Sequence, residues 1–366
     1  MALTAGIVGL PNVGKSTLFN AITGASVEAA NYPFATIDKN VGVVEVRDER
    51  IRILSQMYEP KKTIFTTFEF CDIAGLVKGA SKGEGLGNQF LANIREVDAI
   101  IHVVRCFDNS DILHVEGRIN PIDDIEIIEL ELQLADLNTI DNRIGKIEKK
   151  AKTNDKEALL EYNLLLRCKE RLLAGNMLLG LEVSDSELKL IKTYHFLTYK
   201  PVIYVANVDE GDLLDLENCD YYQRVIEFAS KKNSDVIPIS ARMEMELSTL
   251  DYADQLEYLK EYNCQESGLD KIIKTAYHTL NLRTFFTVGK DEVRAWTFKE
   301  GMKAPACAGV IHTDFERGFI KAEVFAYDDL IALGSEVAIK DAGKFRIEGK
   351  EYLVKDGDIL HFRFNV

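Results

Sequence analysis

Near its amino end the chain carries a glycine-rich segment whose residues suit the binding of phosphate groups. Residues 9–16 read Gly-Leu-Pro-Asn-Val-Gly-Lys-Ser, which is the G-x-x-x-x-G-K-S pattern of a phosphate-binding loop (P-loop). Backbone N–H groups in such a loop point at a phosphate, and the start of the following helix adds positive partial charge. Lys15 would reach the β- and γ-phosphates, and the Ser16 hydroxyl would ligate Mg²⁺. We therefore predict nucleotide contacts from Asn12, Val13, Gly14, Lys15, Ser16 and Thr17.

The residues on either side of this loop predict the elements that it requires. Residues 3–8 are short, apolar and partly β-branched, as a buried strand should be. Residues 17–22 have the composition of the first turns of a helix. Because strand, glycine loop and helix follow one another, a chance glycine turn is the weaker alternative.

Two further segments predict the parts of a nucleotide switch. Asp72-Ile73-Ala74-Gly75 ends the apolar run 68–71 and matches D-x-x-G, so Asp72 would hold Mg²⁺ through water and the Gly75 N–H would bind the γ-phosphate. Thr36 lies between the two motifs and is the expected second protein ligand of Mg²⁺. The glycine-rich stretch 75–87 could order on a γ-phosphate and relax after hydrolysis, the alternative being an ordinary flexible loop.

The segment expected to read the base follows the predicted strand 202–206. Guanine readers use N-K-x-D, in which the Asp carboxylate accepts two hydrogen bonds from the guanine edge. Here Val208 replaces the Lys and Glu210 replaces the Asp, so the carboxylate lies one methylene further out. Losing a buried polar match can cost several powers of ten in discrimination, which puts guanine specificity in doubt. Adenine could instead be read by Asn207 and backbone groups near Val208, with Ser240-Ala241 as the second base-side loop.

Composition bounds the classes of protein that the chain can belong to. It has 366 residues, of which 46% are hydrophobic, and a net charge of −15. This negative charge argues against a protein that binds nucleic acid over its whole surface, so any RNA contact must come from a local basic patch. The six cysteines form no C-x-x-C pair, which suits reduced thiols of a cytosolic protein. We expect no signal peptide, no membrane span and a cytoplasmic location.

Periodicity predicts an α/β domain that is interrupted by a long helical segment and followed by a smaller domain. The apolar runs 99–104, 202–206 and 236–239 suit parallel strands of a doubly wound sheet. Residues 125–194 are charged and Leu-rich, with a break at 153–155, which predicts two antiparallel helices joined at a tip. After residue 281 the chain predicts a small α+β domain, with strands at 284–288, 293–298 and 359–364 and a helix at 306–311.

Basic residues gather near the predicted tip of the helical hairpin. They are Arg143, Lys146, Lys149, Lys150 and Lys152. They could form a contact for RNA, or simply a solvated helix face, and the sequence favours neither. In the last domain Lys290, Arg294, Lys299, Lys303, Arg317 and Lys321 could face rRNA, although scattered surface cations are the commoner explanation.

Four motifs together resemble the YchF, or Obg-like ATPase, family. They are GLPNVGKST at 9–17, NYPFAT at 31–36, DIAGL at 72–76 and NVDE at 207–210, and the resemblance spans the whole chain. It implies an Obg-type G domain (1–122 and 198–280), a helical coiled-coil insertion (123–197) and a C-terminal TGS domain of β-grasp type (281–366). It also implies a preference for ATP and association with the ribosome or its large subunit. We expect a monomer.

Catalysis must differ from that of a familiar GTPase, in which a Gln after D-x-x-G orients the attacking water. Here that position is Leu76, whose aliphatic side chain cannot orient water. Three substitutes stay open: K⁺ held by Asn12, as the Asn of related cation-dependent enzymes does; His114 as an acid–base group; or a residue supplied by a partner. Turnover should be slow in each case. The alternatives to an ATPase switch are a GTPase with an unusual base motif and an RNA- or ribosome-binding module with a structural nucleotide, whereas a small-molecule kinase is disfavoured.

Overall fold

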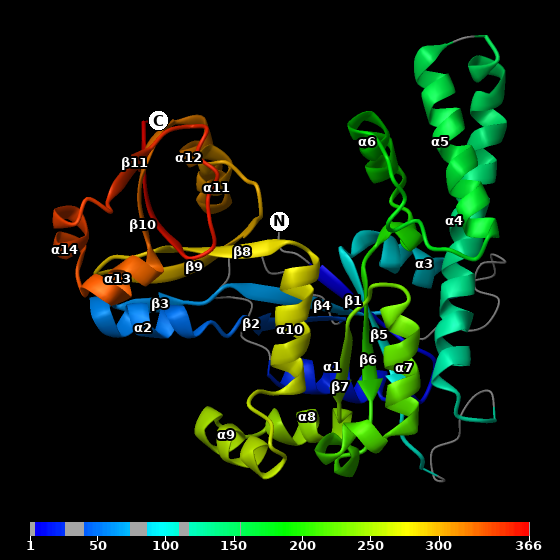
Figure 1. Ribbon diagram of the computed structural model, residues 1–366, viewed down its shortest axis with the longest axis horizontal. Coiled ribbons are helices and arrows are strands. Elements are labelled where there is room, and N and C mark those ends of the chain that lie inside the picture. The colour runs from blue at the N-terminus through cyan, green and yellow to red at the C-terminus, as the bar shows by residue number, and fades with distance from the viewer. Residues whose placement is uncertain (1–3, 26–39, 74–85, 110–116, 154, 366) are drawn as a thin grey trace. The chain divides into compact units, whose positions relative to one another are not determined.

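A computed structural model describes residues 4–25, 40–73, 86–109, 117–153 and 155–365 (Figure 1). The chain divides into two compact units. One comprises Met1–Val44 with Glu69–Ile272, and the other comprises Glu45–Phe68 with Ile273–Val366. The second unit therefore includes residues 45–68. We had expected these residues to belong to the G domain.

The first unit is built on a six-stranded sheet of order β2-β4-β1-β5-β6-β7. Its strands are β1 (Thr4–Val8), β2 (Val41–Glu45), β4 (Thr67–Asp72), β5 (Ala99–Arg105), β6 (Val202–Asn207) and β7 (Val236–Ile239). Strand β1 pairs in parallel with β4 and β5, β5 with β6, and β6 with β7. Every residue of β5 is buried, as an apolar run covered on both faces requires. The predicted doubly wound sheet and its strands at 99–104, 202–206 and 236–239 are confirmed.

Helices follow the strands of this sheet and place several loops at one edge. They are α1 (Lys15–Gly24), α3 (Leu86–Glu96), α7 (Asp220–Ser230), α8 (Ala241–Leu247), α9 (Tyr252–Glu261) and α10 (Gly268–Thr279), whose residues from Ile273 onward belong to the second unit. Because β1, β5, β6 and β7 run in the same direction, the residues that follow each of them lie at the same carboxyl edge. Ligands of doubly wound sheets bind at this edge.

Two long helices form the predicted hairpin, α4 (Pro121–Ala151) and α5 (Lys156–Leu173) (Figure 1). Asp155 begins α5 by accepting hydrogen bonds from the N–H groups of Glu157 and Ala158, so the expected break at 153–155 is confirmed. A third helix, α6 (Asp185–Tyr194), shares the apolar core of the hairpin through Ile191. Its start is marked in the sequence by a capping box, in which Ser184 and Glu187 bond each other's backbone N–H groups.

The second unit is an α+β fold with a mixed sheet of order β11-β10-β12-β8-β9-β3. Its strands are β3 (Lys62–Ile64), β8 (Leu282–Thr287), β9 (Glu292–Lys299), β10 (Phe319–Ala326), β11 (Arg346–Glu348) and β12 (Asp358–Phe364). Its helices are α2 (Glu49–Tyr58), α11 (Ala304–Ile311), α12 (Thr313–Arg317), α13 (Tyr327–Leu333) and α14 (Glu336–Asp341). The strands and the helix predicted after residue 281 are confirmed. Strands β10 and β11 and helices α12, α13 and α14 were not predicted.

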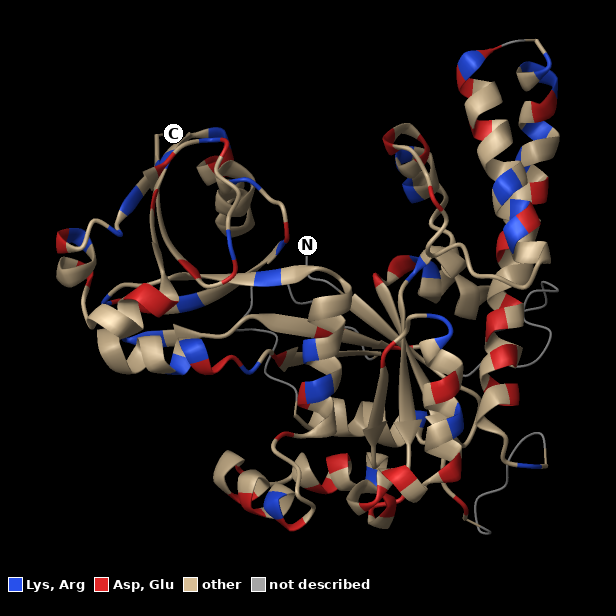
Figure 2. Cartoon of the chain, in the orientation of Figure 1, with Lys and Arg blue, Asp and Glu red and all other residues tan. Residues whose placement is uncertain are grey.

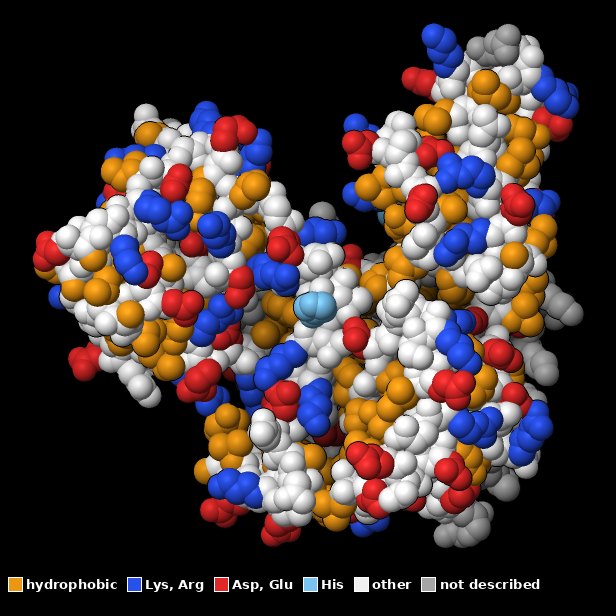
Figure 3. Space-filling model, viewed as in Figure 1, with side chains coloured by type: hydrophobic (Ala, Val, Ile, Leu, Met, Phe, Trp, Pro, Cys, Tyr) orange, Lys and Arg blue, Asp and Glu red, His pale blue; other side chains and the backbone are white. Residues whose placement is uncertain are grey.

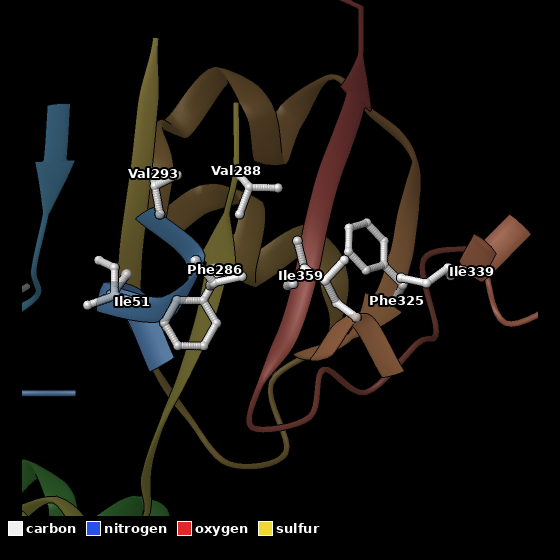
Figure 4. Close-up of a cluster of buried hydrophobic side chains, with 10 residues drawn as sticks. Ile51, Phe286, Val288, Val293, Phe325, Ile339 and Ile359 are labelled. Carbon is white, nitrogen blue, oxygen red and sulfur yellow. The ribbon is translucent and has the colours of Figure 1, made fainter. Parts of the chain in front are cut away.

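Each face of this second sheet carries its own apolar core. Phe285 and Phe286 are consecutive in β8 and therefore point to opposite faces, and each lies in a different cluster. The Phe286 cluster includes Ile51 and Leu54 of α2, both fully buried (Figure 4). Burying such side chains contributes about 1.5–3 kcal/mol each, which explains why residues 45–68 pack in this unit.

Among the described helices none is both long enough and apolar enough to cross a membrane.

Candidate nucleotide-binding site

A cavity of about 730 Å³ opens at the carboxyl edge of the first sheet. Its volume is in the range of pockets that hold drug-sized ligands. Its lining comes from the loops after β1, β5, β6 and β7. The lining residues are Leu10, Pro11, Asn12, Gly14, Lys15, Ser16, Thr17, Phe107, Asn109, Asn207, Val208, Asp209, Ser240, Ala241 and Arg242. Four segments that are spread along the chain from Leu10 to Arg242 thus converge on one cavity.

The glycine-rich loop has the backbone geometry that phosphate binding requires. Asn12 and Gly14 both adopt positive φ, 65° and 95°, and α1 begins at the next residue, Lys15. A Cβ on Gly9 would come within 2.8 Å of the Val103 carbonyl oxygen, so the loop also needs glycine where it leaves β1. Gly14 offers no side chain to cap the first N–H groups of α1, which suits a phosphate in that place.

Lys15 and Asp72 join the P-loop to the D-x-x-G segment. The Lys15 ammonium donates a hydrogen bond to the Asp72 carboxylate, and the two side chains are 11% and 25% exposed. This ion pair connects the end of β4 to the start of α1. The two charged groups that the sequence assigns to the γ-phosphate and Mg²⁺ are therefore adjacent.

Asn207 joins the P-loop to the second base-side loop. Its Nδ2 donates to the Val13 carbonyl over 2.9 Å, and its Oδ1 accepts from the Ala241 N–H over 2.9 Å. The residue is 4% exposed. An amide nitrogen has a second hydrogen and the oxygen a second lone pair, so each atom keeps one further bonding position. Contact of Asn207 with adenine stays a prediction, whereas its bridging of the two loops is observed.

Glu210 and Val13, which we predicted to contact the nucleotide, are not among the residues that line the cavity. Their contact with the nucleotide stays a prediction. Val13 is 1% exposed and contributes its carbonyl to Asn207 instead. Glu210 is directed to Arg242, whose Nε lies 3.4 Å from Glu210 Oε1. The chain turns into a short 3₁₀ helix at Gly211–Leu214, which takes Glu210 out of the lining.

Asp209, the residue before Glu210, does line the cavity. Burial raises the pKa of the Asp209 carboxyl, and the nearby carboxylates of Asp212 and Asp108 raise it further. The guanidinium groups of Arg105 and Arg242 act in the opposite direction.

Several lining residues were absent from the sequence prediction. They are Leu10, Pro11, Phe107, Asn109, Asp209 and Arg242. A signal for Phe107 did exist, because it follows the predicted strand 99–104 at the edge where ligands bind. Leu10 and Pro11 lie inside the P-loop motif itself. Thr36, Gly75, Leu76 and His114 fall outside the described residues, so their predicted roles stay predictions.

Comparison with known proteins decides the family. A family model described as "50S ribosome-binding GTPase" matches residues 4–144, and the YchF-GTPase_C model, described as "Protein of unknown function (DUF933)", matches residues 282–365. The chain is 56% identical to the ribosome-binding ATPase YchF of Bacillus subtilis and 52% identical to that of Escherichia coli O157:H7, with 100% of both chains covered in each case. The chain belongs to the YchF family.

A solved YchF structure has the same fold. The YchF GTPase of Schizosaccharomyces pombe superposes with a TM-score of 0.88 at 41% identity, covering 99% of this chain and 97% of that one. The similarity to YchF proteins thus extends over both compact units and the helical hairpin.

Proposed function

We propose that this chain is an ATP-binding, slowly ATP-hydrolysing switch protein of the cytoplasm that binds the ribosome as a monomer. The preference for ATP over GTP is inferred from the position of Glu210. Its carboxylate pairs with Arg242 and does not line the cavity, so it is poorly placed to accept the paired hydrogen bonds of a guanine edge. The names of the bacterial relatives, ribosome-binding ATPase, support the same choice.

The second candidate is a GTPase, which the description of the Schizosaccharomyces pombe protein favours. Asp209 is the feature that could serve it, because this carboxylate does line the cavity. Asp209 however occupies the third position of the N-x-x-E segment, one residue before the Asp of a guanine reader.

The phosphate half of the site would hold the triphosphate and Mg²⁺. The hydroxyl of Ser16 and the carboxylate of Asp72 are hard oxygen donors, which Mg²⁺ prefers, and the Lys15–Asp72 pair places the carboxylate at the P-loop. Thr36 would add a second protein ligand. The ion would supply charge neutralisation between the β- and γ-phosphates. When a phosphate arrives, Lys15 would exchange part of its contact with Asp72 for the phosphate oxygens.

Hydrolysis would depend on a group other than Leu76. His114, K⁺ at Asn12 and a residue from a partner are the three candidates. We expect His114→Ala to slow hydrolysis without weakening ATP binding, as measured by single-turnover phosphate release alongside a binding titration. Unchanged turnover would exclude a catalytic role for His114.

Ribosome contact would come from the helical hairpin and from the C-terminal unit, which we propose is a TGS domain. Two cations near the tip already have acidic partners, since Arg143 pairs with Glu161 and Lys152 with Glu148. Lys146, Lys149 and Lys150 of α4 carry exposed side chains. Figure 2 shows basic segments, in blue, at the tip of the hairpin. They are the stronger candidates for rRNA. Over the face seen in Figure 3, charges of both signs are interspersed, in keeping with a local contact instead of a continuous basic surface.

The test is a competition titration of a fluorescent ATP analogue by unlabelled ATP and GTP, with Mg²⁺ and K⁺ present. We expect ATP to compete about tenfold better or more, which corresponds to about 1.4 kcal/mol. A preference for GTP would overturn the proposal and favour the second candidate. Failure of both to compete would leave a ribosome-binding module without nucleotide chemistry.

A further inference from the structure

One fully buried guanidinium lies directly behind the nucleotide cavity. Arg105 is the last residue of β5 and has 0% exposure. Its backbone is paired in register with Asn207 of β6, and the next N–H, that of Cys106, donates to the Asn207 carbonyl over 2.8 Å. Burying a charge costs free energy unless its donors are bonded, so an apolar residue would serve better here if packing were the only requirement.

The Arg105 side chain organises the segment that leaves β5. Its Nε donates to the Phe107 carbonyl over 3.2 Å and its Nη2 to the Asn109 carbonyl over 3.1 Å. The guanidinium also lies over the Phe107 ring, 4.6 Å from the ring centroid. After Cys106 the chain leaves the sheet. There the Arg105 guanidinium donates hydrogen bonds to the carbonyls of Phe107 and Asn109, as a neighbouring strand does within the sheet. A lysine has no planar fork and could not hold both carbonyls in this way.

The segment that Arg105 holds is a wall of the cavity. Phe107 and Asn109 both line it, together with 207–209 and 240–242. The P-loop residues account for the phosphates, so these other segments must face the nucleoside. The Arg105 charge also lowers the pKa of Asp209, the lining carboxyl that burial raises.

We propose that Arg105 is a positioning residue that fixes Phe107 and Asn109 as the nucleoside-binding wall of the cavity. The proposal rests on the proposed function, because it takes a nucleoside triphosphate as the ligand. Arg105 itself acts through these residues. Its loss should weaken binding of the nucleoside and leave binding of the bare phosphate chain intact.

The test compares two ligands by calorimetry in the presence of Mg²⁺: ATP and inorganic tripolyphosphate. For Arg105→Lys we expect affinity for ATP to fall about tenfold or more, with affinity for tripolyphosphate unchanged. The matched control is Arg171→Lys. Arg171 likewise donates to two backbone carbonyls, those of Met177 and Leu179, but it lies in the hairpin region and should not alter either affinity.

A double-mutant cycle tests whether Arg105 acts through Phe107. If it does, Arg105→Lys should cost little further ATP affinity once Phe107→Ala is present. Additive losses, or equal losses for ATP and tripolyphosphate, would overturn the proposal. If thermal melting shows that Arg105→Lys does not fold, Phe107→Leu is used instead. This variant removes only the ring that contacts the Arg105 guanidinium, and its affinities for ATP and tripolyphosphate are compared in the same way. A wild-type chain that prefers GTP would overturn the proposed function, and the Arg105 proposal is then judged by the same loss measured with GTP.

Discussion

Gly14 and Asn207 lie so close together that a methyl group on Gly14 would come within 2.1 Å of Asn207 Nδ2. The two residues are 193 positions apart in the sequence, and their approach brings the P-loop against the base-side loop. The same glycine has a φ of 95°, a conformation that residues with a Cβ rarely adopt. Space and backbone geometry therefore both require glycine at this position.

Gly14→Ala should abolish nucleotide binding, because the added Cβ displaces the Asn207 amide and strains the loop. We expect the free energy of unfolding to fall by about 1–3 kcal/mol. The control is Gly145→Ala in α4, where a Cβ meets nothing within 4 Å. That variant should keep nucleotide binding and gain about 0.5–1 kcal/mol of stability from helix propensity. Nucleotide binding by Gly14→Ala at wild-type affinity would contradict the observed geometry.

Asn207→Ala removes both hydrogen bonds that join the two loops. The Val13 carbonyl and the Ala241 N–H then lose their partner in a buried place, so stability should fall by about 1–3 kcal/mol. Affinity for ATP should fall about tenfold or more, as measured by calorimetry. Asn218→Ala is a suitable control, because Asn218 is exposed and its side-chain amide donates to the Asp215 carboxylate. Equal affinities for wild type and Asn207→Ala would show that the bridge is dispensable.

Lys15→Ala should abolish nucleotide binding or turnover, since it removes the cation that reaches the β- and γ-phosphates. Its partner Asp72 is 25% exposed and keeps access to water, so the fold should tolerate the change. Phosphate release and a thermal melt measure the two effects. Lys152→Ala, which removes the exposed pair with Glu148, should change neither. Wild-type hydrolysis by the Lys15 variant would refute the P-loop assignment.

Glu244 should make stability depend on pH near neutrality. This carboxyl of α8 accepts hydrogen bonds from the Gly268 and Leu269 N–H groups at the start of α10, over 2.7 and 3.1 Å. Burial raises its pKa to about 7, against the hydrogen bonds from those N–H groups, which lower it. The folded state thus binds the proton more tightly than the unfolded state does. This contribution to stability is complete below pH 4.5 and is lost as pH rises through 7.

Urea unfolding of wild type and Glu244→Gln at pH 5, 6, 7 and 8 checks this. The Gln variant has no proton to lose, so the stability of wild type relative to it should fall by up to about 1.4 kcal/mol per pH unit between about pH 5 and 7. Above pH 7 the difference should level off. Glu246→Gln on the same helix is the matched control, because that side chain is 44% exposed. A difference for Glu244 that is constant over this range would contradict the raised pKa.

Reversing the charge of Lys146, Lys149 and Lys150 together should weaken ribosome binding. These exposed cations near the hairpin tip would contact phosphates, so wild-type affinity should also fall steeply with added salt. Co-sedimentation with ribosomes at two salt concentrations measures both effects. Charge reversal of Lys189 and Lys192, exposed on α6, controls for the loss of positive charge. Binding that is indifferent to salt and to the tip variant would exclude a phosphate-dominated contact at this place.

The sequence by itself determined the elements whose geometry depends on consecutive residues. The P-loop needs glycine at two fixed positions between a strand and a helix, and β1, Gly14 and α1 follow in that order. Strands covered on both faces are apolar at nearly every position, so β5, β6 and β7 could be placed within one or two residues. The hairpin was equally predictable, because helical periodicity and an N-cap such as Asp155 are local signals.

Only the tertiary structure decided which distant segments meet. Helix α2 and strand β3 belong to the C-terminal unit, since Ile51 and Leu54 bury their side chains against a sheet formed more than 200 residues later. Likewise the parallel register of β5 with β6 brings Arg105 beside Asn207, and the turn after β6 aims Asp209 into the cavity and Glu210 at Arg242. The register and packing of two separate segments cannot be read from the periodicity of either segment. The free energy that favours them comes from contacts between the segments, which exist only in the folded chain.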